Sequence, residues 1–149
     1  GLVARRRGHD DRVERTEAPT DADLIELARG ATARAYAPYS KFKTAAAVET
    51  DSGDVVVGVL VENVSLGLAM CAERAAMFSV VASDARPVRL ALAAPDTDGS
   101  LTWPCGACLQ VALELGGRDL VVVVGDDDDG PVATSTVGAL LPKGPKVDG

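Results

Sequence analysis

The chain has 149 residues, a formal net charge of −7, and a hydrophobic fraction of 47% with only 3% aromatic residues. These values indicate one ordinary globular domain with a core built from Ala, Val and Leu, because aromatic side chains are too few to fill it. The acidic balance argues against nucleic acid as a partner, and no apolar run is long enough to cross a membrane.

The first elements in chain order are a charged segment, a helix and a hairpin. Residues 1–19 lack hydrophobic periodicity, so we expect a disordered or cloning-derived tail without a signal peptide. A helix is predicted from Thr20 or Asp21, either of which can cap it, and Pro38 is expected to end it. Two extended runs joined by "DSGD" over residues 42–63 then predict a β-hairpin.

The rest of the domain alternates helices and strands. A helix is predicted over residues 69–82 and another from Pro104 to the glycines at 116 and 117. The apolar runs "VRLALAAP" and "DLVVVVG" predict buried strands, and a short strand, "PVATS", and a short helix, "TVGALL", complete the domain. Near-continuous apolar strands bounded by helices predict an α/β fold whose sheet is covered on both faces.

Cysteine usage indicates a metal site. Three cysteines, an odd number, fit a metal or redox site in a reducing cytoplasm better than a disulfide framework. Cys71 begins one predicted helix, while Cys105 and Cys108 share a face in the first turn of another. The three thiolates can therefore hold one ion. Since the only histidine, His9, lies in the tail, a fourth position stays open for water, as in a catalytic Zn²⁺ site.

Glu73 and Arg74 complete the motif "CAER". Glu73 lies two residues from a ligand, where its carboxylate can take a proton from metal-activated water and pass it to a substrate. Arg74 can donate hydrogen bonds to the thiolates and offset the negative charge that three thiolates give the zinc unit. Cys-x-Glu followed by Pro-Cys-x-x-Cys is the pattern of zinc nucleoside deaminases.

Three other interpretations of the cysteines stay open. The cysteines could be small buried core residues, or "WPCGAC" could be a redox site similar to the Trp-Cys-x-x-Cys of thioredoxins. The chain could also be a non-catalytic zinc protein that serves as an interaction module. Retention of Glu73 argues against that last interpretation, because zinc binding does not require this carboxylate.

Over roughly residues 21–142 the chain resembles the small homotetrameric cytidine deaminases. "YAPYSKFKTAAAV" resembles the opening motif of that family, "VENVSLGLAMCAERAA" its first zinc motif and "PCGACLQV" its second. The resemblance implies a deaminase domain over residues 20–142 followed by a C-terminal tail, 143–149. It also implies a three-layer α/β/α sandwich with a mixed five-stranded sheet. It implies a Zn²⁺ cofactor, a nucleoside substrate, and sites shared between the subunits of a homotetramer. It further implies a cytoplasmic role in pyrimidine salvage.

The resemblance also implies roles for residues on the substrate side. Phe42 would pack in the pocket, Glu62 would bind a sugar hydroxyl, and the backbone of Ala72 would contact the base. Pro104 and Gln110 would support the second zinc motif. Taken without the resemblance, Glu62 can equally be a surface acid and Phe42 an ordinary core residue.

Three departures from the family pattern fall on substrate binding. Leu60 stands where the family usually has Asn, which helps to hold the ribose together with the residue at Glu62. Leu66 stands where an aromatic side chain often reaches into a neighbouring subunit, and "LLPKGP" lacks the usual Phe. We therefore predict hydrolytic deamination of cytidine or deoxycytidine. The alternative substrate is another cytosine derivative, such as a modified nucleoside or a nucleoside antibiotic.

Overall fold

A mixed β-sheet forms the middle layer of the protein, seen in a computed structural model that describes residues 2–3, 12–15 and 17–147. Its main strands are β3 (Ala45–Thr50), β4 (Val55–Val59), β5 (Pro87–Ala93), β6 (Val121–Gly125) and β7 (Val132–Thr136). Their spatial order is β4-β3-β5-β6-β7, and only β5 and β6 run parallel. This part of the sheet confirms the predicted mixed five-stranded sheet and α/β class.

Two further strands lie in the segment for which a disordered tail was predicted. The strands β1 (Leu2–Val3) and β2 (Arg12–Arg15) pair with each other, and β2 also pairs antiparallel with the edge strand β4. With them the sheet has seven strands in the part of the chain that the structure describes. The prediction is therefore wrong for these strands, and the rest of that segment up to residue 16 lies outside the described residues.

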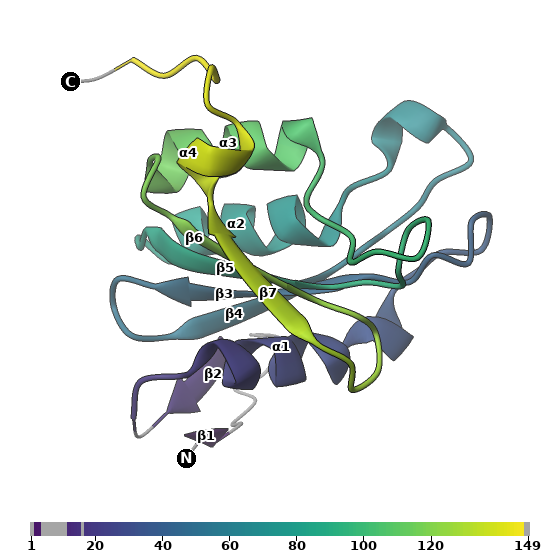
Figure 1. Cartoon of the computed structure of the whole chain (residues 1–149), viewed down its shortest axis with the longest axis horizontal. Helices are drawn as coiled ribbons and strands as arrows, with labels where there is room; N and C mark the ends of the chain where they lie inside the picture. Colours follow the sequence, from purple (N-terminus) through teal and green to yellow (C-terminus); the bar gives the residue numbers. More distant parts are fainter. Residues whose placement is uncertain (1, 4–11, 16, 148–149) are drawn as a thin grey trace.

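Four α-helices of the described residues cover the two faces of the sheet. Helix α1 (Asp21–Arg29) lies on one face, and α2 (Ala72–Ala82), α3 (Gly106–Gly116) and α4 (Val137–Leu140) lie on the other (Figure 1). This three-layer arrangement was predicted. Within the described part of the chain, no helix is long and apolar enough to span a membrane.

Helix α1 begins where its cap predicted and ends earlier than expected. Thr20 Oγ1 accepts a hydrogen bond from Asp23 N (3.1 Å), and Thr20 N donates to Asp23 Oδ2 (2.8 Å), which is a capping box. The helix stops at Arg29 instead of reaching Pro38. Gly30 follows as its C-cap, and a separate 3₁₀ turn, Thr32–Arg34, comes next.

Each face of the sheet has its own apolar core, because side chains alternate along a strand. On β4, Val55 and Val57 pack against α1, while Val56 packs against the layer that contains α2 and α3. Alanine and valine make up most of both cores, as the composition predicted. The hairpin of β3 and β4 has the expected turn, in which Gly53 adopts a positive φ of 93°.

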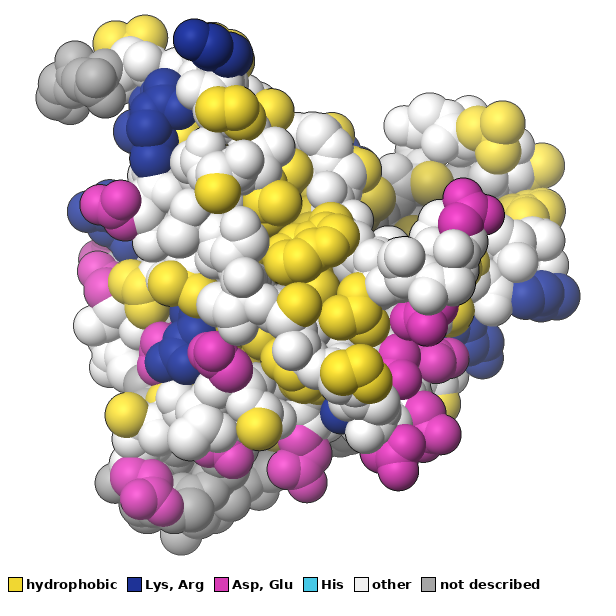
Figure 2. Space-filling model, viewed as in Figure 1, with side chains coloured by type: hydrophobic (Ala, Val, Ile, Leu, Met, Phe, Trp, Pro, Cys, Tyr) yellow, Lys and Arg dark blue, Asp and Glu magenta, His cyan; other side chains and the backbone are white. Residues whose placement is uncertain are grey.

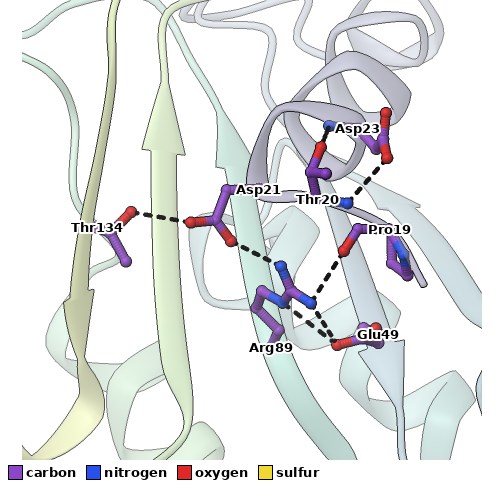
Figure 3. Close-up of polar contacts among 7 residues, drawn as sticks. All are labelled: Pro19, Thr20, Asp21, Asp23, Glu49, Arg89 and Thr134. Atoms are coloured by element: carbon purple, nitrogen blue, oxygen red, sulfur yellow. Dashed lines mark hydrogen bonds and ion pairs between the residues drawn. The ribbon is translucent and has the colours of Figure 1, made fainter.

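A network centred on Arg89 fastens the start of α1 to the sheet (Figure 3). The guanidinium of Arg89 on β5 donates to Glu49 Oε1 on β3 (3.0 and 3.2 Å) and to Asp21 Oδ1 on α1 (2.7 Å). It also donates to the carbonyl oxygen of Pro19 (3.1 Å). Thr134 on β7 donates to the second oxygen of Asp21 (3.3 Å). The network therefore joins three strands to one helix.

Replacing Arg89 by Met is expected to lower the free energy of unfolding by about 2–4 kcal/mol, because the largely buried Glu49 carboxylate loses its cation. Urea unfolding measures the loss, with Arg86→Met, an exposed position just before β5, as the control. Equal stability of the Arg89 and Arg86 variants would show that the network does not hold α1 in place.

Candidate metal centre and active site

The three cysteines lie together because helices α2 and α3 begin at the same end of the sheet (Figure 1). Cys71 is the N-cap of α2 and Cys105 is the N-cap of α3, whereas Cys108 lies in the first turn of α3. Helix α2 starts at Ala72, three residues later than predicted, and a separate 3₁₀ turn, Leu66–Leu68, precedes it. That later start places Cys71 at the N-terminus of the helix.

The geometry of the cluster fits zinc. The three Sγ atoms lie within 4.8 Å of one another, and those of Cys105 and Cys108 are 3.5 Å apart. Tetrahedral Zn²⁺ with Zn–S bonds of about 2.3 Å would hold sulfurs about 3.8 Å apart, so a small adjustment would bring all three to one ion. Cys105 is exposed, Cys71 is half-buried and Cys108 is buried, so solvent reaches part of the cluster.

Glu73 lies next to the cluster in an almost dry environment. The residue is 4% exposed, and this burial raises the pKa of its carboxyl group to about 7. The negative charge of the Cys71 thiolate adds to the same shift. A carboxyl group with a pKa near neutrality can both accept and release a proton at physiological pH, as acid–base catalysis requires.

Arg74 and the neighbouring thiol stabilise the thiolate of Cys71. The thiol of Cys108 donates a hydrogen bond to Cys71, and the guanidinium of Arg74 donates another, with 3.3 Å between Nη2 and Sγ. Together they lower the pKa of the Cys71 thiol to about 5, although partial burial opposes them. The contact with Cys71 in turn raises the pKa of Arg74. Arg74 is thus placed against the sulfur of Cys71.

The predicted substrate-side residues have different surroundings. Ala72 is fully buried in the first turn of α2, and Phe42 is half-buried against the core cluster on that face. Leu60 is half-buried just after β4, where its backbone pairs with Thr44 and Tyr36. The apolar side chain of Leu60 offers no hydrogen bond there.

Glu62 is held by the turn that precedes β3. Its Oε1 accepts hydrogen bonds from the backbone amides of Tyr39 (3.1 Å) and Ser40 (3.2 Å). A hydrogen bond from the Ser40 side chain contributes most to lowering the pKa of Glu62. Sequence reasoning treated "PYS" as part of a motif and missed these donors. The carboxylate of Glu62 lies three residues after the end of β4, and nothing in the sequence there indicates a partner more than twenty residues earlier.

Pro104 and Gln110 support α3 in different ways. Pro104 is buried immediately before the helix, whereas Gln110 Nε2 donates to the carbonyl oxygen of Pro145 (2.8 Å). Gly144 is also buried, and Arg118 donates to its carbonyl oxygen (3.1 Å). The described part of the predicted C-terminal tail therefore packs along α3, and Gln110 fastens that segment.

Comparison with known proteins points to the same family as the sequence motifs do. The family model for the cytidine and deoxycytidylate deaminase zinc-binding region matches residues 18–124. A cytidine deaminase of Mycobacterium tuberculosis is 46% identical over 112 residues, which are 75% of this chain and 79% of that protein. A cytidine deaminase of Halalkalibacterium halodurans is 40% identical over 119 residues, which are 80% of this chain and 89% of that protein.

A solved structure extends the similarity to the fold. The crystal structure of cytidine deaminase from Burkholderia pseudomallei superposes with a TM-score of 0.78 at 44% identity, covering 84% of this chain and 98% of that chain. The region matched by the family model contains all three cysteines and the buried Glu73. On the strength of the shared sequence, fold and thiol cluster, the chain belongs to the family of zinc-binding cytidine and deoxycytidylate deaminases.

Proposed function

We propose that this protein hydrolyses cytidine or deoxycytidine to uridine or deoxyuridine and ammonia, with Zn²⁺ held by Cys71, Cys105 and Cys108. The observation that carries the proposal is the buried Glu73 beside three converging thiols. When bound, the metal would supply Lewis-acid activation of a water molecule. The donor set, three thiolates with no fourth protein ligand among the residues that the structure describes, leaves room for that water.

In the proposed mechanism Glu73 transfers protons at two stages. Its carboxylate removes a proton from the attacking water and delivers it to the ring nitrogen adjacent to the carbon that bears the amino group. A second transfer then protonates the departing amine, so that ammonia leaves and a carbonyl group remains. Arg74 donates to Cys71 throughout and limits the negative charge at the centre. The buried Ala72 would present its backbone to the base.

An ammonia-release screen tests this proposal. Zinc-loaded protein is incubated with cytidine, deoxycytidine, cytosine, adenosine and several modified cytosine nucleosides. We expect turnover of cytosine nucleosides and none of adenosine. Because Leu60 cannot hydrogen-bond, turnover of a modified nucleoside above that of cytidine would favour the alternative substrate class. Turnover of adenosine without any cytosine nucleoside would overturn the proposal.

Glu62→Gln is expected to raise the KM for cytidine roughly tenfold to a hundredfold, with a smaller effect on kcat, if Glu62 binds a sugar hydroxyl. The Gln side chain keeps a carbonyl oxygen that can still accept from the Tyr39 and Ser40 amides, so the turn should survive. Steady-state kinetics measure the change, with the exposed Glu26→Gln as the control. An unchanged KM would leave Glu62 with a structural role alone.

We also propose the homotetramer of the family, with sites shared between subunits. The segment before α2 exposes Val64 (79%), Leu66 (84%) and Leu68 (68%), and the helix itself exposes Phe78 and Val81. Apolar side chains so exposed are typical of an interface. Light scattering of the purified protein tests the assembly.

The electrostatic character of the surface supports a small-molecule substrate. On the face that carries β7, Lys and Arg side chains are scattered around the margin, while hydrophobic side chains gather in the middle beside β7 (Figure 2). Together with the net charge of −7, this favours a nucleoside over a nucleic acid. Three cysteines without a disulfide support the proposed location, a reducing cytoplasm. A role in pyrimidine salvage is proposed from the deamination of a pyrimidine nucleoside.

A further inference from the structure

The first turn of helix α2 lies directly on strand β4 at Gly58. A Cβ atom added to Gly58 would lie 2.6 Å from the carbonyl oxygen of Ala72 and 2.6 Å from the amide nitrogen of Ala76. Both are backbone atoms, which cannot rotate out of the way as a flexible side chain could. No side chain of any kind therefore fits at Gly58 while α2 keeps its position.

The residues around this contact are all small. Gly58 follows Val56 on the face of β4 that packs against α2, and its partner across the β3–β4 ladder is Ala46. Ala72 and Ala76 meet it from the helix, and all three alanines are fully buried. Glycine weakens a strand relative to alanine, so a glycine in mid-strand calls for a packing reason. The close packing of the α2 backbone against Gly58 is that reason.

We propose that Gly58 is a positioning residue for the metal centre. The turn that touches it begins at Cys71 and contains Glu73, whereas Cys105 and Cys108 belong to α3. A displacement of α2 away from β4 would thus move one thiolate and the proton carrier relative to the other two thiolates. The inference rests on the zinc-dependent function proposed above.

The size of the displacement decides how much the metal centre is affected. Ordinary van der Waals contact starts at 3.4 Å, so an alanine at Gly58 must push the Ala72 and Ala76 backbone away by about 0.8 Å. Zinc–thiolate distances are fixed at about 2.3 Å with a tolerance of about 0.2 Å. The shift exceeds that tolerance several times, so the three sulfurs could reach one ion only by straining the helices.

The test is the zinc affinity of Gly58→Ala, measured by competition with a chromogenic chelator and without any substrate. We expect an affinity 10-fold to 100-fold below that of the unchanged protein. The absorption bands of the Co²⁺-loaded variant should also change, because they report the tetrahedral thiolate geometry. Since neither readout involves turnover, both remain valid if the proposed deaminase activity fails.

Two glycine variants serve as matched controls. An added Cβ at Gly116, at the far end of α3, would meet the Leu120 side chain and the carbonyl oxygen of Pro87 (2.9 Å), so Gly116→Ala should lower stability with little effect on zinc. At Gly30 an added Cβ finds ordinary contacts of 3.5 and 3.6 Å, so Gly30→Ala should change neither. Urea unfolding of each variant separates lost stability from lost affinity.

If Gly58→Ala does not fold, Ala76→Ser adds one atom to the same contact from the helix side. It should give a smaller loss of zinc affinity in the same direction, roughly 3-fold to 10-fold. Zinc affinity within threefold of the unchanged protein in a folded Gly58→Ala or Ala76→Ser would overturn the proposal. An equal loss in Gly116→Ala would do the same, because it would reflect stability alone.

Discussion

Replacing Glu73 by Gln is expected to lower kcat for cytidine by about 10²–10⁴ while zinc content stays at one ion per chain. The amide matches the carboxyl group in shape but cannot carry a proton between water, ring nitrogen and amine. Burial already raises the pKa of Glu73 to about 7, so it can exchange protons near neutrality. The pKa values of Glu62 and Asp126 are instead lowered, so neither carboxylate is suited to replace Glu73.

The control for this variant is Glu26→Gln, which changes an exposed acid on α1, on the opposite face of the sheet. Its kcat and zinc content should match those of the unchanged protein. Full turnover by Glu73→Gln would refute the proton-transfer role. Loss of zinc together with turnover would instead make Glu73 a residue that maintains the metal centre.

Replacing Cys108 by Ser is expected to reduce bound zinc to well below one ion per chain and to abolish deamination. Cys108 is fully buried, and its Sγ is one of the three converging thiol sulfurs. A serine hydroxyl stays protonated at neutral pH and is a poor zinc ligand, whereas a thiolate binds strongly. Loss of a ligand should lower affinity more than the 10-fold to 100-fold typical of residues that only support ligands.

Elemental analysis after gel filtration measures the zinc, and the ammonia assay measures turnover. Treating the unchanged protein with a chelator should reproduce the loss of turnover, and added Zn²⁺ should restore it there but not in Cys108→Ser. Retention of full zinc and activity by Cys108→Ser would show that this thiol is not a ligand. A zinc-free unchanged protein with a reversible Cys105–Cys108 disulfide would favour the redox interpretation.

Local rules predicted each half of the thiol cluster, whereas the packing of α2 beside α3 brings the two halves together. A separation of three residues puts Cys105 and Cys108 on one helix face, and the start of a second helix at Cys71 supplies the third sulfur. Glu73 follows Cys71 by two residues, so its position beside the cluster is equally local. The layer order followed from alternating helices and apolar strands.

The remaining features depend on contacts between segments distant in the sequence. The backbone donors to Glu62 come from Tyr39 and Ser40, more than twenty residues earlier. Strand β2 gains its partner only because β4 lies at an edge of the main sheet. In the sequence Gly58 is an ordinary strand glycine, and only the structure shows that the backbone of α2 packs directly against it. Such tertiary contacts leave no periodic pattern in the sequence.

The claim that the three thiols hold a catalytic zinc is tested most directly by titrating Zn²⁺ into metal-free protein while cytidine deamination is followed. The account predicts that the rate rises linearly and stops rising at one zinc per chain, with one ammonia released for each uridine formed. A rate that does not depend on zinc, or the absence of any deamination at full zinc occupancy, would contradict it.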